Sequence, residues 1–240
     1  MKKGIKSAAI CLLLAFSLSG CFRISHMALA DGQSSIDTSK KSIALLTVKI
    51  SNKNKPSYQP TIDHAFIVPK ENPSTIPMAM RKYIFETDKP YRSEPDSYNE
   101  HLLSFSLNPG IHHFQFLQMV YNNVALSAKC LINLNMKKDI KPNSVVYLGH
   151  IDAVIREKKD GEESSCQSLS GGLLSFIDQA TVGFYPSGFL EAKITDNYEE
   201  DVKLFNTAYP GLKNVVIEKS ILPSWNNPNN KYNGDINLAE

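Results

Sequence analysis

The chain has 240 residues, of which 42% are hydrophobic and 21% are charged, and its formal net charge is +2 at pH 7. Three lysines lie in the first 20 residues, which contain no acidic side chain, so removing them leaves 23 Lys and Arg against 24 Asp and Glu, a net charge of −1. That near-neutral charge argues against a nucleic-acid binder or a polybasic membrane surface, and the remaining length is enough for the buried core of one domain.

The chain begins with the pattern of an export signal. Lys2, Lys3 and Lys6 form a basic start, and residues 8–18 (AAICLLLAFSL) are apolar apart from one serine. This run is about half of the roughly 20 apolar residues that span a bilayer. A basic start, a short apolar run and then small residues are typical of a secretory signal. We therefore expect residues 1–20 to be a cleaved signal peptide.

The apolar run ends in Leu18, Ser19, Gly20 and Cys21, which together resemble the bacterial lipobox at all four positions. In that family the cysteine sulfur receives a diacylglycerol, the chain is cut just before the cysteine, and the new amino group is usually acylated. The resemblance implies lipidation of Cys21. It also implies a stable membrane anchor, because each buried CH₂ contributes about 0.8 kcal/mol and two or more acyl chains hold where one does not.

The residues after Cys21 bear on where the mature protein stays. In enteric bacteria an Asp in the next position retains a lipoprotein at the inner membrane. Phe22 stands there instead, so the resemblance implies a lipid-anchored envelope protein at the outer membrane, facing the periplasm. The alternative is an ordinary A-x-A cleavage site at residues 28–30, which would release a soluble protein. We expect residues 21–41, which are polar and mixed, to form a flexible tether with a reach of about 25 Å.

The folded domain is expected at residues 42–222. Residues 42–51 are apolar at nearly every position, which predicts a largely buried strand. Residues 52–98 hold seven of the 13 prolines. Because proline is confined to edges and turns of sheets, we expect short edge strands there, such as 64–68 and 82–86, separated by long loops.

The clearest strand patterns lie between residues 102 and 156. A strand at 103–107 and a second at 111–121 are separated by Asn-Pro-Gly, a turn sequence. Residues 124–136 then alternate with a period of two, which predicts a long strand with one wet face. After a turn at 137–143, a further strand is expected to present one face formed by Val145, Tyr147, Gly149, Ile151, Ala153 and Ile155. The two strands on either side of this turn are expected to form a hairpin, which the charged loop 157–165 closes.

Two cysteines remain once Cys11 leaves with the signal and Cys21 carries lipid. Cys130 and Cys166 then lie in an oxidising compartment. A disulfide between them would close a loop of about 37 residues and contribute roughly 3–4 kcal/mol in the chain-entropy model. The alternative is a buried, free Cys130 and an unrelated loop cysteine. The chain has no C-x-x-C spacing, so neither a zinc ribbon nor a thioredoxin-type site is indicated.

The last third of the chain predicts one more strand, one helix and a short final strand. We expect strands at 173–184 and 215–222. Between them, Asp196 and Glu199 form a candidate capping box, and Pro210 with Gly211 ends the helix. The apolar stripe of this helix, with spacings of three and four residues, consists of Tyr198, Val202, Phe205 and Tyr209. Residues 223–240 are rich in Asn and are expected to be a flexible tail.

Many strands and one late helix predict a mainly β fold, an antiparallel β-sandwich with one α-helix in the C-terminal half. The segment from Asn108-Pro109-Gly110 into residues 111–114 (IHHF) resembles the "PG-x-H" hairpin of transthyretin-like and PEGA-like bacterial envelope domains. Residues 145–151 (VVYLGHI) are similar to a strand found in many uncharacterised lipoproteins. Together these resemblances cover about 50 residues. They imply a transthyretin- or immunoglobulin-like sandwich and no particular activity.

No catalytic or metal-binding motif is present in the sequence: there is no G-x-S-x-G, HExxH, P-loop or G-x-G-x-x-G. We therefore assign no catalytic residue, no metal and no cofactor. His112 and His113 are adjacent, so on a strand they point to opposite faces and cannot both ligate one ion. His150 and Asp152 share a strand face. They could orient an imidazole for base catalysis or form an ordinary polar pair.

Two further groups have both a structural and a functional interpretation. Glu199, Glu200 and Asp201 lie in the first helical turn, where acids favour the positive end of the helix dipole; a calcium or partner site is the alternative. The Asn-rich tail lacks the EF-hand spacing, and Trp225 and Tyr232 could make it a docking segment.

By exclusion, the sequence favours a non-enzymatic, membrane-anchored envelope lipoprotein that binds or scaffolds another envelope component, most readily a protein, through exposed strand edges. A glycan- or peptidoglycan-binding module is the second hypothesis; its candidate aromatic residues are Tyr185, Trp225 and Tyr232. The third is an unrecognised secreted hydrolase. That hypothesis requires a cleft holding two carboxylates, or His150 near a serine.

Overall fold

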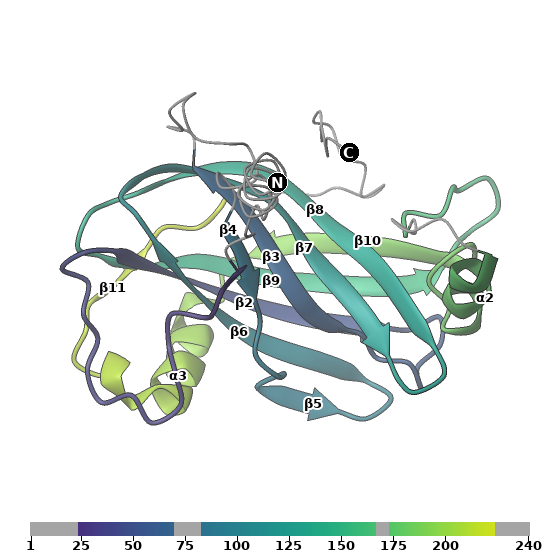
Figure 1. The fold of residues 1–240 in the computed structure, drawn as a ribbon, viewed down its shortest axis with the longest axis horizontal. Coiled ribbons are helices and arrows are strands. Elements are labelled where there is room, and N and C mark those ends of the chain that lie inside the picture. The colour runs from purple at the N-terminus through teal and green to yellow at the C-terminus, as the bar shows by residue number, and fades with distance from the viewer. Residues whose placement is uncertain (1–23, 70–82, 167–172, 224–240) are drawn as a thin grey trace, which may run out of the picture.

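Two β-sheets lie face to face in the computed structural model, which describes residues 24–69, 83–166 and 173–223 (Figure 1). The first sheet has the order β1-β4-β3-β7-β8, and the second has the order β10-β9-β2-β6-β5 with β11 beside β9. The mainly β sandwich predicted from the sequence is confirmed. It is mixed rather than wholly antiparallel, because β2 and β11 both run parallel to β9, and β1 runs parallel to β4.

The elements have the following bounds. The first sheet consists of β1 (Ile24–Ser25), β3 (Thr61–Pro69), β4 (Tyr83–Glu86), β7 (Gly110–Asn122) and β8 (Ser127–Ile140). The second consists of β2 (Ser42–Asn52), β5 (Arg92–Glu94), β6 (Tyr98–Leu107), β9 (Val145–Glu157), β10 (Gly188–Thr195) and β11 (Ile217–Lys219). The helices are α2 (Leu173–Thr181), α3 (Tyr198–Ala208) and the 3₁₀ turn η2 (Pro210–Leu212).

The main core fills the space between the sheets. Every second residue of β8 points into it, as the period of two predicts: Ala128, Cys130, Ile132, Leu134 and Met136. Their counterparts on the central strand of the second sheet are Ala44, Leu46, Val48 and Ile50.

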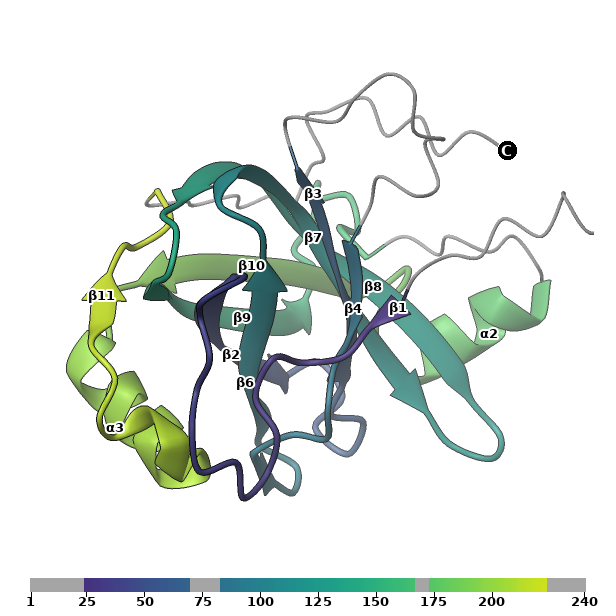
Figure 2. The ribbon, with the colours of Figure 1, turned by 60° about the vertical axis from the view of Figure 1, so that its left-hand side comes forward.

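A second core lies on the opposite face of the second sheet. Ile43 and Leu45 of β2 pack there with Phe205 of α3 and Leu212 of η2. Strand β2 is therefore buried on both faces, which accounts for its nearly unbroken apolar sequence. Helix α3 and the chain between β1 and β2 form this third layer (Figure 2). The stripe predicted for α3 is the face that packs there.

Residues 24–36, which belong to the segment expected to be a tether, pack against the domain. Leu29 is only 1% exposed. The backbone N–H of Ala28 donates to the carbonyl of Ser104 at 2.8 Å, and the N–H of Gly211 donates to the carbonyl of Gln33 at 3.0 Å. The tether expectation is therefore wrong for residues 24–36, because Ala28, Leu29 and Ile36 cover part of the second sheet. Residues 1–23, which include the lipobox, and residues 224–240, with Trp225 and Tyr232, lie outside the described residues.

Several predicted strands differ in extent or position. Residues 173–181 form helix α2 rather than a strand; a short apolar run does not distinguish the two by periodicity. Strand β8 begins at Ser127 instead of Val124, because the Asn123 side chain accepts the N–H groups of Ala125 and Leu126 and closes a turn.

Two predictions about strand position are also wrong. The strands predicted at the sheet edge at 64–68 and 82–86 are internal, because β3 lies between β4 and β7, and β4 lies between β1 and β3. Strands β8 and β9 do not form a hairpin, because the chain crosses from one sheet to the other between Ile140 and Val145.

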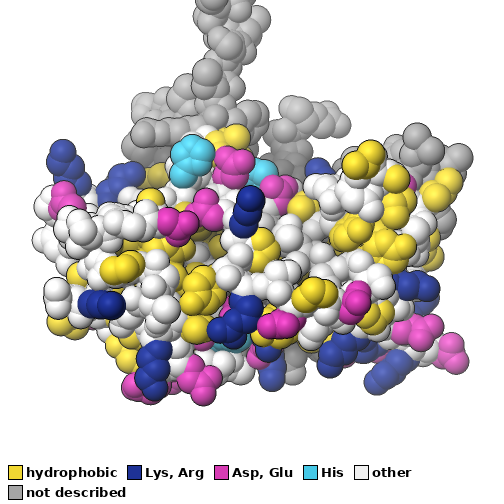
Figure 3. Space-filling view, turned by 90° about the horizontal axis from the view of Figure 1, so that it is seen from below, with side chains coloured by type: hydrophobic (Ala, Val, Ile, Leu, Met, Phe, Trp, Pro, Cys, Tyr) yellow, Lys and Arg dark blue, Asp and Glu magenta, His cyan; other side chains and the backbone are white. Residues whose placement is uncertain are grey.

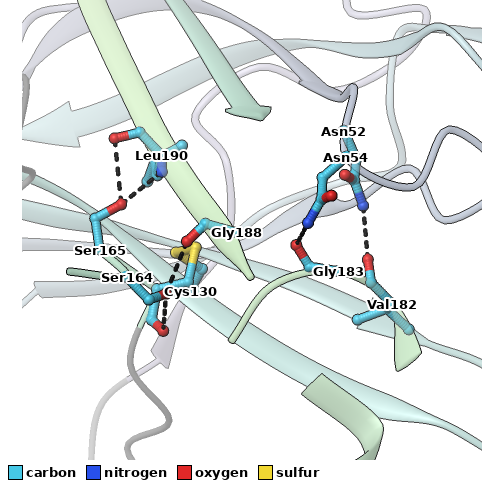
Figure 4. Close-up of a disulfide and its surroundings, with 10 residues drawn as sticks. Asn52, Asn54, Cys130, Ser164, Ser165, Val182, Gly183, Gly188 and Leu190 are labelled. Atoms are coloured by element: carbon cyan, nitrogen blue, oxygen red, sulfur yellow. Dashed lines mark hydrogen bonds between the residues drawn. A yellow bond between two sulfur atoms is a disulfide. The ribbon is translucent and has the colours of Figure 1, made fainter. Parts of the chain in front are cut away.

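The predicted disulfide is present. Cys130 of β8 and Cys166 are joined, with a Cα–Cα distance of 4.9 Å, and both are fully buried. Figure 4 shows the surroundings of the bond. The segment of Cys166 is fixed beside β10, because the Ser164 hydroxyl donates to the carbonyl of Gly188 at 2.7 Å. The bond therefore joins the first sheet to a segment that is hydrogen-bonded to β10, the edge strand of the second sheet.

Two asparagines fix the end of α2 nearby. Asn52 Nδ2 donates to the carbonyl of Val182 at 2.8 Å, and Asn54 Nδ2 donates to the carbonyl of Gly183 at 2.7 Å (Figure 4).

Loss of the disulfide should lower the free energy of unfolding by about 3–4 kcal/mol, the value for a closed loop of about 37 residues. We expect this loss in the double variant Cys130→Ala/Cys166→Ala, measured by urea unfolding. The wild type should show a comparable loss in reductant, whereas the double variant should be insensitive to reductant. A wild type that unfolds at the same urea concentration with and without reductant would contradict the prediction.

Candidate functional site

A bulge in β9 places the polar residues of the candidate site. Leu45 of β2 lies opposite Tyr147, but Thr47 lies opposite His150, so β9 has one residue more than β2 over this stretch. Gly149 in the bulge has a φ of 128°, which L side chains rarely adopt. As a result Tyr147 and His150, three residues apart, both face α3.

The bulge also corrects the face predicted for this strand. Beyond it, Ile151, Ala153 and Ile155 point into the core between the sheets. Before it, Val145 and Tyr147 belong to the core under α3. The simple alternation expected from the sequence is therefore wrong at Gly149.

Asp201 of α3 is the centre of a buried polar cluster, with only 2% of its surface exposed. The hydroxyl of Tyr147 donates to its Oδ2 at 2.6 Å, and His150 Nδ1 lies 3.0 Å from Oδ2 and 3.1 Å from Oδ1. On the other side of the ring, His150 Nε2 lies 3.6 Å from Oδ1 of Asp152. Lys193 Nζ lies 3.7 Å from the second oxygen of Asp152.

The charges of this cluster stabilise one another. Burial alone would lower the pKa of His150, but the carboxylates of Asp152 and Asp201 outweigh it and raise the pKa to about 9. The hydrogen bond with His150 in turn lowers the pKa of Asp152. Burial, with the neighbouring Asp201 carboxylate, raises the pKa of Tyr147. At neutral pH His150 is therefore an imidazolium between two carboxylates.

These contacts hold α3 against β9 and do not position His150 as a catalytic base. Both nitrogens of His150 face carboxylates and the ring is buried, so neither nitrogen is positioned to take a proton from a substrate. No serine hydroxyl hydrogen-bonds to His150 among the residues that the structure describes. Of the three helix acids singled out in the sequence, Asp201 joins His150, whereas Glu199 and Glu200 are exposed.

The start of α3 differs from the predicted capping box. Asn197 is the N-cap and makes no side-chain cap hydrogen bond. Asp196 Oδ1 accepts the N–H of Tyr198 at 3.2 Å, and its other oxygen pairs with Lys219 of β11. Asp196 therefore connects the helix to the last strand.

The adjacent histidines have separate surroundings, as expected from a strand. His112 is buried, and its Nε2 lies 2.7 Å from the carbonyl oxygen of Asn108. His113 Nε2 lies 2.6 Å from Oδ1 of Asn135 on the exposed side. Within residues 24–69, 83–166 and 173–223, no group of three or more His, Cys, Asp or Glu side chains could hold a metal ion.

A cavity of about 720 Å³ lies at the edge of the third layer. Its walls come from four segments: residues 26–31, the loop 88–91 between β4 and β5, residues 101–103 of β6, and the end of α3 at 208–209. Asp31 and Asp88 both line it. Sequence reasoning missed this cavity, because the four segments are distant in the chain and the first was expected to be a tether.

The protein surface around these features carries both signs of charge. On the face shown in Figure 3, basic and acidic side chains are interspersed rather than gathered into blocks of one sign. Such a surface has no strong field of one sign to attract a polyanion.

The chain matches no protein-family model, no curated protein and no solved structure. None of the helices in the described part of the chain is long and apolar enough to span a membrane.

Replacing Gly149 by alanine should lower the free energy of unfolding by more than about 2 kcal/mol. Positive φ strains any L residue by about 1–3 kcal/mol, and the new Cβ would lie 3.1 Å from Cγ2 of Ile194. Gly110→Ala is the matched control: its φ is 120°, but its Cβ would meet no atom within 4 Å. Urea unfolding should show a larger loss for Gly149→Ala. Equal losses would show that the contact with Ile194 costs nothing.

The stability of the protein should fall as the pH rises from about 6.5 to about 9. His150 keeps its proton up to about pH 9 in the folded state but loses it near pH 6.5 when unfolded. The ionised ring therefore contributes its full stabilisation only below about pH 6.5, and the contribution of about 3 kcal/mol disappears above pH 9. His150→Gln should abolish this fall, measured by urea unfolding at several pH values, whereas His113→Gln should retain it. If the free energy of unfolding of His150→Gln fell equally steeply with pH, the stabilising role of the His150 cluster would be contradicted.

Proposed function

We propose that the chain is a lipid-anchored, non-enzymatic binding module of the bacterial cell envelope, held by a lipid on Cys21, and that it binds or scaffolds another envelope component. The observation that carries the anchor is the run Leu18-Ser19-Gly20-Cys21 at the point where the apolar segment ends. A localisation at the outer membrane, facing the periplasm, is part of the proposal and follows from Phe22.

The position of β1 supports a domain that lies close to the membrane. Ile24 already pairs with Ile84 of β4, in the first sheet. Only three residue steps separate it from Cys21, and each extended residue spans at most about 3.6 Å. A lipid on Cys21 would therefore hold the domain within about 11 Å of the anchor point, instead of at the end of a long tether.

The distribution of polar groups supports binding rather than catalysis. His150, the strongest candidate for a base in the sequence, is enclosed by Asp152 and Asp201. Asp31, Asp88 and Tyr91, which line the 720 Å³ cavity, are exposed, so a ligand can reach them. A hydrolase is the second candidate, because Asp31 and Asp88 place two carboxylates in that cavity.

The anchor is tested by replacing Cys21 with alanine in the full chain. We expect the variant to lose incorporation of a fatty-acid probe and to remain unprocessed before residue 21, because no other sulfur occupies the lipobox position. Cys11→Ala, within the signal, is the matched control and should be labelled and processed normally. Normal labelling of Cys21→Ala would overturn the anchor.

The binding role is tested by recovering the lipidated protein from crosslinked envelopes, with a mock-tagged strain as the control. A stoichiometric protein partner, identified by mass spectrometry, would support the scaffolding role. Recovery of glycan fragments alone would favour the glycan-binding form of the proposal. Recovery of nothing above the control would count against both.

A further inference from the structure

His101 of β6 presents a hydrogen-bond donor to the 720 Å³ cavity. The residue lines the cavity and is only 1% exposed. Its Nε2 accepts the backbone N–H of Ile62 at 3.1 Å. Burial lowers the pKa of this histidine to about 4, so the ring is neutral at physiological pH.

The hydrogen bond from Ile62 determines which nitrogen carries the proton. A neutral imidazole has one N–H and one acceptor nitrogen. Because Nε2 is the acceptor, Nδ1 must be the donor. Nδ1 makes no hydrogen bond with another described residue, and it is not among the fully buried polar atoms that lack a partner, so it reaches solvent. The cavity therefore offers a fixed N–H to an oxygen atom of a ligand.

Acceptors and aromatic rings line the same cavity. Burial raises the pKa of Tyr209 to about 12, and the charges of Asp88 and Asp31, followed by Tyr91, add to the effect. The same three groups line the cavity with Tyr209, so two carboxylates lie close to two phenol rings. Tyr91 is 38% exposed and lies at the rim. Lys89 adds one ammonium group to the lining.

The walls of the cavity are held in place by hydrogen bonds. The N–H of Leu29 donates to Ser104 Oγ at 3.0 Å, next to the bond from Ala28 to the Ser104 carbonyl. The N–H of Gly211, just after α3, donates to the carbonyl of Gln33. The volume lies within the range of about 300–1,000 Å³ that is usual for ligand pockets.

We propose that this cavity binds a neutral saccharide. His101 Nδ1 donates to a hydroxyl or acetamido oxygen, Asp31 and Asp88 accept hydroxyl protons, and Tyr91 packs against the apolar face of a sugar ring. A sugar suits this lining because its hydroxyls both donate and accept while its C–H face is apolar. A simple amine would satisfy the carboxylates but would leave the His101 N–H without an acceptor and would lie near the Lys89 ammonium.

The inference rests on the proposed function in that it names the class of component that the binding module recognises. Its test does not depend on the anchor. Full-length protein in detergent micelles is titrated with tri-N-acetylchitotriose and with maltotriose, and binding is measured by calorimetry. We expect at least one of the two to bind with a Kd of about 1 mM or tighter.

Two variants locate the binding in the cavity. Tyr91→Ala and Asp88→Asn should each weaken the affinity about tenfold or more, because one removes the ring surface and the other removes a charged acceptor. Asp96→Asn, in the exposed turn between β5 and β6, is the matched control and should bind as the wild type does. Undiminished binding in both cavity variants would overturn the site.

A measurement on the wild-type protein keeps the test decisive even if the variants misfold. With ¹⁵N-labelled histidine, the Nδ1–H signal of His101 should be present at neutral pH and should shift when the binding saccharide is added. The absence of binding by both saccharides would overturn the inference, as would binding of spermidine instead. If neither saccharide binds but the wild type is labelled normally with lipid, the proposed lipid anchor on Cys21 is still supported. Cleavage of the saccharide, detected by mass spectrometry, would support the site but contradict the non-enzymatic part of the proposed function.

Discussion

Strand β2 must be covered on both faces, and most of the architecture follows from that constraint. Its inward side chains pack against the first sheet, and its outward ones, Ile43 and Leu45, require a third layer. A single sheet with one wet face would leave these residues in water, at a cost of about 25 cal/mol for each Å² of apolar surface. Helix α3, η2 and the segment around Leu29 supply the missing cover.

The third layer is fastened by a polar contact inside an apolar interface. Burying a carboxylate such as that of Asp201 is costly unless it is paired and hydrogen-bonded. Tyr147 and His150 satisfy it, and both reach α3 only because the bulge at Gly149 turns them to the same side. The layer is also incomplete. Between the end of α3 and the N-terminal segment a gap remains beside residues 101–103 of β6, and the cavity lies there.

Patterns within one segment predicted β2, β6 to β9 and α3 approximately. Strand β10 was not predicted, and properties that depend on contacts between segments were missed. The period of two in β8 and the apolar stripe of α3 are local, so the sequence shows them directly. The disulfide was predictable because two cysteines remain after the signal and the anchor are set aside. In contrast, the nine residues of α2 are too few for periodicity to distinguish a helix from a strand.

The candidate sites depend on distant segments in the same way. His150 and Asp201 were each noticed, but they are 51 residues apart and nothing local pairs them. The single extra residue at Gly149 could not be seen in an alternating sequence, since a bulge is defined by its partner strand. Asp31, Asp88 and His101 come from three segments, the first of which was expected to be unstructured.

The pairing of Ile24 with β4 has a consequence for how the protein would meet its partners. In the proposed anchored form, a domain joined to a lipid on Cys21 by so few residues would have little freedom to move away from the bilayer or to tumble, so its accessible volume would be a thin layer at the membrane surface. For a partner held in the same membrane, this confinement raises the effective concentration well above that of a free protein. The degree of complex formation would then depend on the number of molecules per area of membrane, and components standing far from that surface would be out of reach.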